Sequence, residues 1–277
     1  MDHLLPTFMP VIVYWITSAI YSKLIDSNDE NRLFSKEEEQ AQNAVPSNQV
    51  VRGVLKTHAL QIALGLIYFT ILGRGKSGAQ GEGSCLGTAK DAAVATLVLD
   101  AWEYFTHRLM HESQFMFRNF HQMHHHLQVP YSYGAQYTDL VDAFVSQFLG
   151  IIVCVELSGI SAKTSAVFFS LLAVKSVDDH CSRWFPRRNP FHRFFRNNVA
   201  FQSVHHQVPG FKYNYSTYFL PTWDMLLGTY MPYAVEDREE GGYRLRTLKT
   251  TDAVASLFVS CVYLAMLVFS ARYYLVR

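Results

Sequence analysis

Long apolar runs separated by polar segments dominate the hydrophobic pattern of the chain. Residues 8–25 are apolar for most of roughly 18 positions, about the length that crosses the hydrocarbon core of a bilayer. No basic region precedes this run and no small-residue cleavage motif follows it, which favours a retained membrane anchor over a signal peptide. Similar runs follow at 54–72, 92–106, 140–157, 160–177 and 253–275.

These runs predict helices, because none alternates strictly between apolar and polar residues as a membrane strand would. The expected fold class is all-α, with polytopic membrane helices. The Ser158-Gly159 break predicts a hairpin of two membrane helices. A soluble protein with five buried helices is the alternative, and the number of runs near 18 residues argues against it.

Two polar segments interrupt the apolar pattern. Residues 26–49 are charged and predict a solvated connector rather than part of a core. Residues 73–87 are rich in glycine and predict a flexible loop. This loop lacks the pattern of a phosphate-binding loop.

The distribution of basic residues predicts the orientation. Excess positive charge marks the cytosolic side of a membrane protein. The Gly-rich loop has only Arg74 and Lys76, whereas the segment after the hairpin has Arg183, Arg187, Arg188, Arg193, Arg196 and Lys212. Threading the spans accordingly places residues 107–137 and 178–251 on one face, in a cytosolic helical cap. The basic stretch 183–196 could equally face anionic headgroups or an acidic partner.

Charge and cysteine content exclude several classes of protein. A net charge of +1 over 277 residues gives no basic surface for nucleic acid. The four cysteines are spread singly, so neither a disulfide framework nor a cysteine zinc site is indicated. Most of the twelve histidines lie between residues 100 and 206, and the chemistry is expected there.

Those histidines recur in three closely spaced groups. In HRLMH, the i, i+4 spacing places His107 and His111 on one helix face. HQMHHH and QSVHH follow, and both have i, i+3, i+4 spacing. One HxxxH pair is expected by chance about 0.5 times, but three such groups are not. The members of the second and third groups are His121, His124, His125, His126, Gln202, His205 and His206.

Imidazole groups in this number indicate metal binding. Neutral imidazole nitrogen suits iron, zinc, copper and nickel. Seven histidines exceed the ligands of one ion, which favours two metals over one metal with surrounding partners. Two isolated histidines lie between the second and third groups. Ligation is predicted for His180, and His192 is an additional candidate with a packing or surface role as the alternative.

Two carboxylates share the helix stripe of the first histidine pair. Asp100 and Glu103 precede His107 and His111 at offsets 0, 3, 7 and 11. Ionisable residues in a membrane helix usually mark a functional site, and these could accept hydrogen bonds from the imidazoles. In the alternative, they face water near a helix end.

Familiar catalytic patterns are absent from the sequence. It contains no HExxH, no GxSxG and no Glu-x-x-His pair of the soluble di-iron bundles. It also lacks a recognisable haem or flavin domain, so electrons are expected from a separate donor.

The order HxxxH, HxxHH and [HQ]xxHH between apolar runs resembles the fatty acid hydroxylase and sterol desaturase superfamily. The segments VDDHCSRWFPRRNPFHRFFRNN, VHHQ, FKYNYS and WDMLLGTYMPY look like the sphinganine C-4 hydroxylases of plants and fungi. The resemblance covers about residues 90–250. It implies an endoplasmic reticulum enzyme that hydroxylates C-4 of a sphingoid base or ceramide with two iron ions, dioxygen, and electrons from NADH or NADPH through cytochrome b5 and its reductase. Zinc could occupy the site in purified protein.

Carried over position by position, the resemblance implies a ligand set and a division of the chain. Residues 1–90 would be N-terminal membrane anchors, 91–251 the catalytic domain and 252–277 a C-terminal apolar helix. Gln202 stands where many relatives have histidine, and an amide binds metal weakly. The implied ligands are His107, His111, His121, His124, His125, His180, His205 and His206, with His192, Gln202, His126, Asp100 and Glu103 as additional or orienting candidates.

Other functions remain open at this point. A desaturase, a fatty acid hydroxylase or a sterol C-4 methyl oxidase could share these ligands. A membrane metal transporter is the alternative from another class, but its ligands would be expected near the bilayer midplane on broken helices. The sequon at Asn214 is expected to stay unmodified, because the predicted topology places it in the cytosol.

Overall fold

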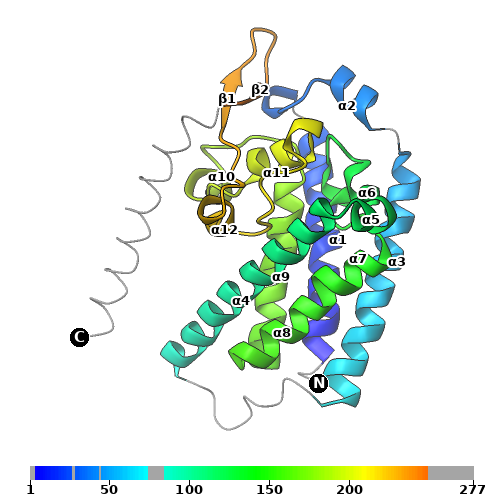
Figure 1. Cartoon of the computed structure of the whole chain (residues 1–277), viewed down its shortest axis with the longest axis vertical. Helices are drawn as coiled ribbons and strands as arrows, with labels where there is room; N and C mark the ends of the chain where they lie inside the picture. The colour runs from blue at the N-terminus through cyan, green and yellow to red at the C-terminus, as the bar shows by residue number, and fades with distance from the viewer. Residues whose placement is uncertain (1–3, 27–28, 44, 74–83, 249–277) are drawn as a thin grey trace, which may run out of the picture.

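The computed structural model describes residues 4–26, 29–43, 45–73 and 84–248. Long helices form a bundle, with α1 (Leu5–Asp26) packed along α9 (Ala162–Asp179) and α4 (Cys85–Glu112) packed along α8 (Leu149–Ser158) (Figure 1). Helix α3 (Ser47–Gly65) also contacts α1. The predicted C-terminal helix at 253–275 lies outside the described residues, as does most of the Gly-rich loop.

Three helices within the described residues are long and apolar enough to cross a membrane. They are Leu5–Leu24, Ser47–Ile71 and Leu140–Ser158. The second continues α3 through the π-helix η3 (Leu66–Ile71), and the third comprises α7 (Leu140–Asp142), the π-helix η6 (Ala143–Phe148) and α8. The chain is therefore a membrane protein, as the sequence predicted.

Two of the predicted spans do not meet this criterion of length and composition. The run at 92–106 lies within α4, and all but the first two residues of the run at 160–177 lie within α9. Helix α9 carries Lys175, Asp178 and Asp179, which are all fully buried. These polar side chains have partners within the protein: Lys175 donates to Asp179, and Asp178 accepts a hydrogen bond from Tyr21.

The predicted hairpin between residues 140–157 and 160–177 is present. Gly159 ends α8 in the left-handed conformation, with φ of 68°, which a glycine adopts without steric cost. Ser161 then caps α9 by accepting a hydrogen bond from the backbone N–H of Thr164.

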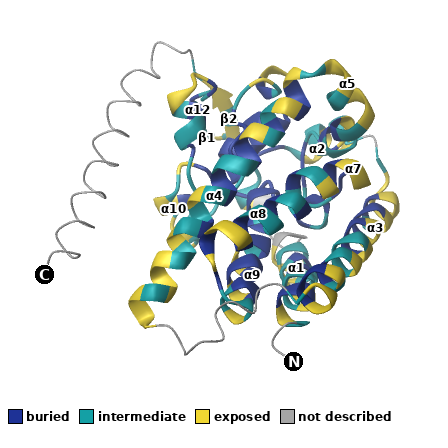
Figure 2. Cartoon of the chain, turned by 60° about the horizontal axis from the view of Figure 1, so that its bottom comes forward, coloured by how far each residue is buried: buried dark blue, intermediate teal, exposed yellow. Residues whose placement is uncertain are grey.

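The outer faces of the spans are apolar, as a lipid environment requires. On α1, the side chains of Ile12, Ile16 and Ile20 are each more than half exposed. They recur every four residues and so form one stripe of the helix. Figure 2 shows exposed residues on the outward faces of α1 and α3, whereas buried residues line the interior of the bundle.

The predicted solvated connector at 26–49 is partly wrong. Leu33 and Phe34 are buried and pack with Cys181 and Val199. Helix α2 (Lys36–Gln42) follows, and its capping box joins Ser35 to Glu38. The apolar Leu33-Phe34 pair fixes this charged segment to the rest of the protein, because burying it removes both side chains from water.

Short elements form a cap at one end of the bundle (Figure 1). An antiparallel pair of strands, β1 (Tyr233–Asp237) and β2 (Tyr243–Thr247), belongs to this region and was not predicted. The structure is otherwise helical, in agreement with the expected fold class. The remaining elements are η2 (Asp29–Asn31), α5 (Gln114–Met116), the π-helix η4 (Phe117–His121), α6 (Gln122–His125), η5 (Ser132–Gly134), α10 (Pro190–Phe194), α11 (Val199–His206), η7 (Val208–Gly210) and α12 (Thr222–Leu226).

Candidate metal centre

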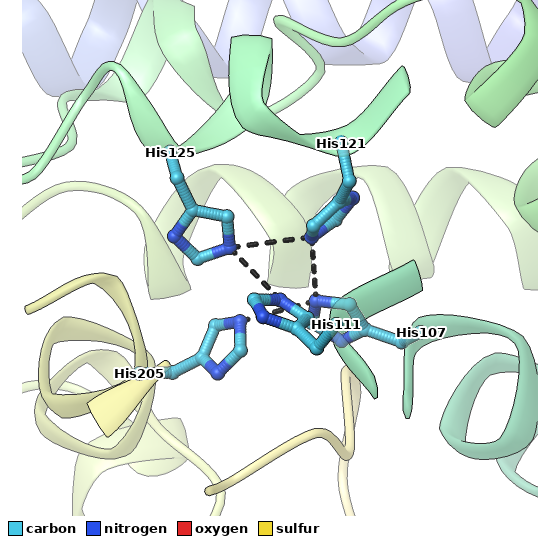
Figure 3. Close-up of side chains that lie close together, drawn as sticks. All are labelled: His107, His111, His121, His125 and His205. Carbon is cyan, nitrogen blue, oxygen red and sulfur yellow. Dashed lines mark hydrogen bonds between the residues drawn. The ribbon is translucent and has the colours of Figure 1, made fainter. Parts of the chain in front are cut away.

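Eight histidines gather in two adjacent groups where the cap meets the bundle. Within each group the candidate ligand atoms all lie within 4.8 Å of one another. The rings of His125 and His206, one from each group, have centroids only 4.8 Å apart, so the groups are neighbours. The first group is His107, His111, His121, His125 and His205 (Figure 3), and the second is His124, His180 and His206.

Local structure explains how each motif is divided between the groups. His107 and His111 project from the same face of the last turns of α4. Helix η4 delivers His121, and α6 begins at the next residue. His121 and His125 point to the first group, whereas His124 points to the second. The HxxHH motif therefore contributes to both groups.

In the first group, imidazole nitrogens face one another at short distance through their lone pairs. The Nδ1 atoms of His107 and His205 each donate a hydrogen bond to a backbone carbonyl, at 2.8 Å to Tyr215 and 2.7 Å to Tyr213. A neutral imidazole has only one N–H, so the Nε2 atoms of both rings are acceptors only. These two Nε2 atoms lie 3.1 Å apart. Facing lone pairs repel, so this arrangement calls for a cation between them.

The Nε2 spacing fits a metal ion. The nitrogens of neighbouring rings in the first group lie 3.0 to 3.2 Å apart. Metal–imidazole bonds are about 2.1 Å long, and two such bonds at a right angle place their nitrogens roughly 3.0 Å apart. The first group can therefore hold one ion with several ligands at right angles, as in octahedral coordination.

In the second group, too, the Nδ1 atoms donate hydrogen bonds to backbone carbonyls. His180 and His206 donate from Nδ1 to the carbonyls of Ser176 and Leu127, at 2.8 and 2.9 Å, and their Nε2 atoms have no hydrogen-bond partner among the described residues. Nδ1 of His124 donates to a carbonyl at 3.3 Å. Three bare imidazole nitrogens can hold a second ion and leave coordination positions open for small molecules.

Burial keeps these imidazoles in the neutral form that binds metal. It lowers the pKa of His205 to about 3 and the pKa of His180 to about 4. Burial, reinforced by repulsion from neighbouring imidazoles, also holds the pKa of His107 and His206 well below the ordinary value. No proton competes with a metal ion for these rings at neutral pH.

A carboxylate that the sequence analysis did not single out orients one of the rings. Asp142 accepts hydrogen bonds from Nδ1 of His121 at 2.8 Å, from Thr138 at 2.6 Å and from Ser146 at 2.8 Å. Hydrogen bonding and charge at Nδ1 fix the tautomer of a ligand and raise the basicity of its other nitrogen. An acidic residue inside the apolar run 140–157 is the signal that could have identified Asp142.

A loop at residues 213–217 supports two of the histidines through its backbone. Asn214 occupies the left-handed region with φ of 58° and accepts a hydrogen bond from the backbone N–H of Met231 at 2.7 Å. The carboxylate of Asp224 accepts from the backbone N–H groups of Tyr215 and Ser216, at 2.9 and 2.8 Å. These bonds fix the carbonyls that receive His107 and His205. The side chain of Asn214 is fully buried.

Five additional candidates do not join either group. Gln202 donates to the carbonyl of Ser216 at 2.8 Å and so supports the loop. His126 is exposed. His192 hydrogen-bonds to Asp178 at 3.1 Å and stacks on Trp184, which explains its burial without a metal. Asp100 and Glu103 are buried, but neither bonds to any of the eight imidazoles in the described part of the chain. The predicted acceptor role falls to Asp142 and to backbone carbonyls.

A pocket of about 150 Å³ leads from the two histidine groups into the bundle. His107, His121, His124 and His180 line one part of it, and Phe169 lines a part closer to the middle of α9. His180 and Phe169 are separated by eleven residues of α9, which corresponds to roughly 16 Å of helix. The pocket therefore connects the candidate metal centre with the apolar interior between the membrane helices.

The sequence is similar to known lipid hydroxylases and to an aldehyde decarbonylase. Residues 92–229 match the family model for fatty acid hydroxylases. Sphinganine C4-monooxygenase 1 of Arabidopsis thaliana is 43% identical, covering 90% of this chain and 95% of the relative. Very-long-chain aldehyde decarbonylase GL1-9 of Oryza sativa is 38% identical over 90% of this chain and 96% of its own length. Sphingolipid C4-hydroxylase sur2 of Schizosaccharomyces pombe is 32% identical over 80% of this chain and 86% of its own. No solved structure matches the chain.

Proposed function

The chain belongs to the fatty acid hydroxylase family, and on this basis we propose that it is a di-iron monooxygenase that hydroxylates C-4 of sphinganine or dihydroceramide. The observation that carries the proposal is the two groups of histidines, with converging Nε2 atoms, that line a pocket between membrane helices. The similarity of this chain to the sphinganine C4-monooxygenases extends over nearly the full length of both proteins.

The proposal assigns one ion to each group. His107, His111, His121, His125 and His205 would hold the first iron, and His124, His180 and His206 the second. When bound and reduced, the iron ions supply the activation of dioxygen that attack on an unactivated methylene requires. No acid or base side chain could remove that hydrogen.

The protein contributes positioning and exclusion of water. Nδ1 hydrogen bonds hold the imidazoles in one tautomer and one orientation. The pocket walls between His180 and Phe169 would hold the lipid chain so that one carbon faces the metals. Regiospecificity would follow from this restriction, because neighbouring methylenes have similar reactivity.

We extend the proposal to the electron source and the location. Electrons would come from NADH or NADPH through cytochrome b5 and its reductase, because the sequence carries no recognisable flavin or haem domain of its own. The enzyme would reside in the endoplasmic reticulum with the histidine cap in the cytosol, as the basic residues around 183–196 predict. Zinc would be an adventitious occupant of purified protein.

A second candidate function rests on the rice relative. A very-long-chain aldehyde decarbonylase at 38% identity has nearly the same coverage as the sphinganine enzymes. The same histidines could therefore act on a long-chain aldehyde. A metal transporter is less favoured, because both histidine groups lie at the cap end of the bundle instead of its middle.

Lipid mass spectrometry tests the proposed function. Cells that lack sphingoid C-4 hydroxylation would express the protein or the double variant His124→Ala, His205→Ala. We expect 4-hydroxysphinganine, free or N-acylated, only with the unaltered protein. Loss of two hydrogens without gain of oxygen would indicate a desaturase, and conversion of aldehydes to alkanes would indicate the second candidate. No sphingoid product from a folded, metal-loaded protein would reject the proposal.

A further inference from the structure

Glu103 is a buried acid that the proposed metal centre does not use. Glu103 is only 5% exposed, and its Oε1 atom makes no hydrogen bond with any residue that the structure describes. It lines the same pocket as His107 and His121. A buried carboxylate without compensation costs several kcal/mol, so a functional partner is expected when the site is in use.

The surroundings of Glu103 lack a positive partner from the protein. Among the described residues that line the pocket there is no lysine or arginine. Asp142 and Asp100, which are themselves acidic, and Tyr218, which also lines the pocket, interact electrostatically with Glu103. A bound cationic group would supply the positive charge that the described pocket-lining residues do not.

The helix geometry places this acid at a defined distance from the metal ligands. Glu103 precedes His107 by one turn of α4, so their Cβ atoms are about 6 Å apart on the same face. Leu99 lies one further turn from the histidines and also lines the pocket, together with Phe148 and Phe169. Along α4 the pocket thus presents a metal ligand, then a carboxylate, then an apolar wall.

We propose that Glu103 binds the 2-ammonium group of a free long-chain base and thereby sets both the reacting carbon and the choice of substrate. This inference rests on the proposed function. In sphinganine the amino nitrogen is three bonds from C-4, so an anchor one helical turn from His107 would hold C-4 beside the metal centre. An ammonium–carboxylate hydrogen bond is charge-assisted and therefore stronger than one from a neutral amide.

This assignment predicts a preference for the free base over ceramide. N-acylation removes the positive charge and leaves one amide N–H, which compensates the carboxylate less well. The buried position of Glu103 strengthens the distinction, because little water is present to stabilise the unpaired acid.

Binding measurements on the purified holoprotein test the inference separately from catalysis. Radiolabelled sphinganine and its neutral N-acetyl analogue would be titrated in detergent against the wild type and Glu103→Gln. We expect the variant to bind sphinganine roughly 10- to 100-fold more weakly, as the loss of a charge-assisted bond implies, and the N-acetyl analogue nearly unchanged. Asp91→Asn removes a carboxylate from the same helix outside the pocket lining and should change neither affinity.

Three outcomes would overturn the inference. They are an equal loss of affinity for both lipids, a loss of bound metal in Glu103→Gln, and unchanged sphinganine binding with lost turnover, which would indicate proton transfer. Glu103→Asp keeps the charge and should retain part of the preference for sphinganine over its N-acetyl analogue. This variant therefore distinguishes the loss of the charge from a folding defect. If the wild type binds the amine through Glu103 but forms no 4-hydroxy product, the amine site stands and the proposed reaction fails.

Discussion

Asp142 accepts the Nδ1 hydrogen of His121 at 2.8 Å, so an acid on one membrane span fixes a ring delivered by the cap. The two residues are 21 positions apart and lie on different elements. Two further hydrogen bonds, from Thr138 and Ser146, hold the carboxylate itself.

Replacing this carboxylate is expected to weaken metal binding while the fold is kept. Asp142→Asn removes the charge that makes His121 a better ligand, and loss of such a partner typically lowers metal affinity by roughly 10- to 100-fold. Metal retention during dialysis against a chelator would measure the change. Asp139→Asn is the matched control, because asparagine also caps a helix well and Asp139 does not contact a histidine. Equal metal loss in both variants would contradict the proposed role.

The two histidine groups predict separate losses of metal. His206→Ala removes one of the three candidate ligands of the second group and should lower the iron content of reconstituted protein from about two ions to about one. His205→Ala instead removes one of the five candidate ligands of the first group and should affect the ion held there. Both variants should lose activity. His126, the exposed last residue of the second motif, serves as the control, and His126→Ala should keep full metal content. A single ion in the unaltered protein would refute the two-site assignment.

Gly210 is expected to tolerate no side chain. A Cβ atom at this position would lie 1.8 Å from the carbonyl oxygen of Val204, in the turn that precedes His205. Gly210→Ala must therefore displace the end of α11, at a cost of about 1–3 kcal/mol in the free energy of unfolding. Thermal unfolding in detergent would report this loss as a Tm lower by roughly 2–4 °C for each kcal/mol. At Gly87 the nearest atom would be 3.5 Å away, so Gly87→Ala should leave the Tm equal or higher.

The predicted orientation can be tested by glycosylation. A sequon inserted between Glu239 and Glu240, in the turn that joins β1 and β2, should remain unmodified if the cap is cytosolic. A sequon inserted at residue 78, on the opposite side in the predicted topology, should be glycosylated. The natural sequon is a poor reporter, because the side chain of Asn214 is fully buried and hydrogen-bonded. A glycan on the turn insertion would reverse the topology.

Sequence spacing predicted which residues gather but not how they are partitioned. The i, i+3, i+4 pattern identified His121, His124 and His125, because helical periodicity places such residues close together. Their division between two groups depends on the π-helical turn η4 and on the approach of α9 and α11, which spacing alone does not encode.

The sequence analysis considered too few of the acidic residues that lie in apolar helices. Asp100 and Glu103 were selected because acids in apolar helices are functional, and the same rule applies to Asp142. The sequence could not show which acid reaches an imidazole, because that depends on how the helices pack. Likewise, Leu33 and Phe34 were missed as core residues because charged neighbours surround them in the sequence.

Five of the six identified Nδ1 acceptors are backbone carbonyls, and this has a consequence for mutational scanning. Every amino acid supplies the same carbonyl, so exchanging the side chain at Ser176 or Leu127 leaves the acceptor in place. A saturation scan would therefore report the histidines and Asp142 as intolerant, while the positions that orient most of the rings would look dispensable. In this protein, much of the information that builds the centre lies in the path of the main chain, where single substitutions do not register it.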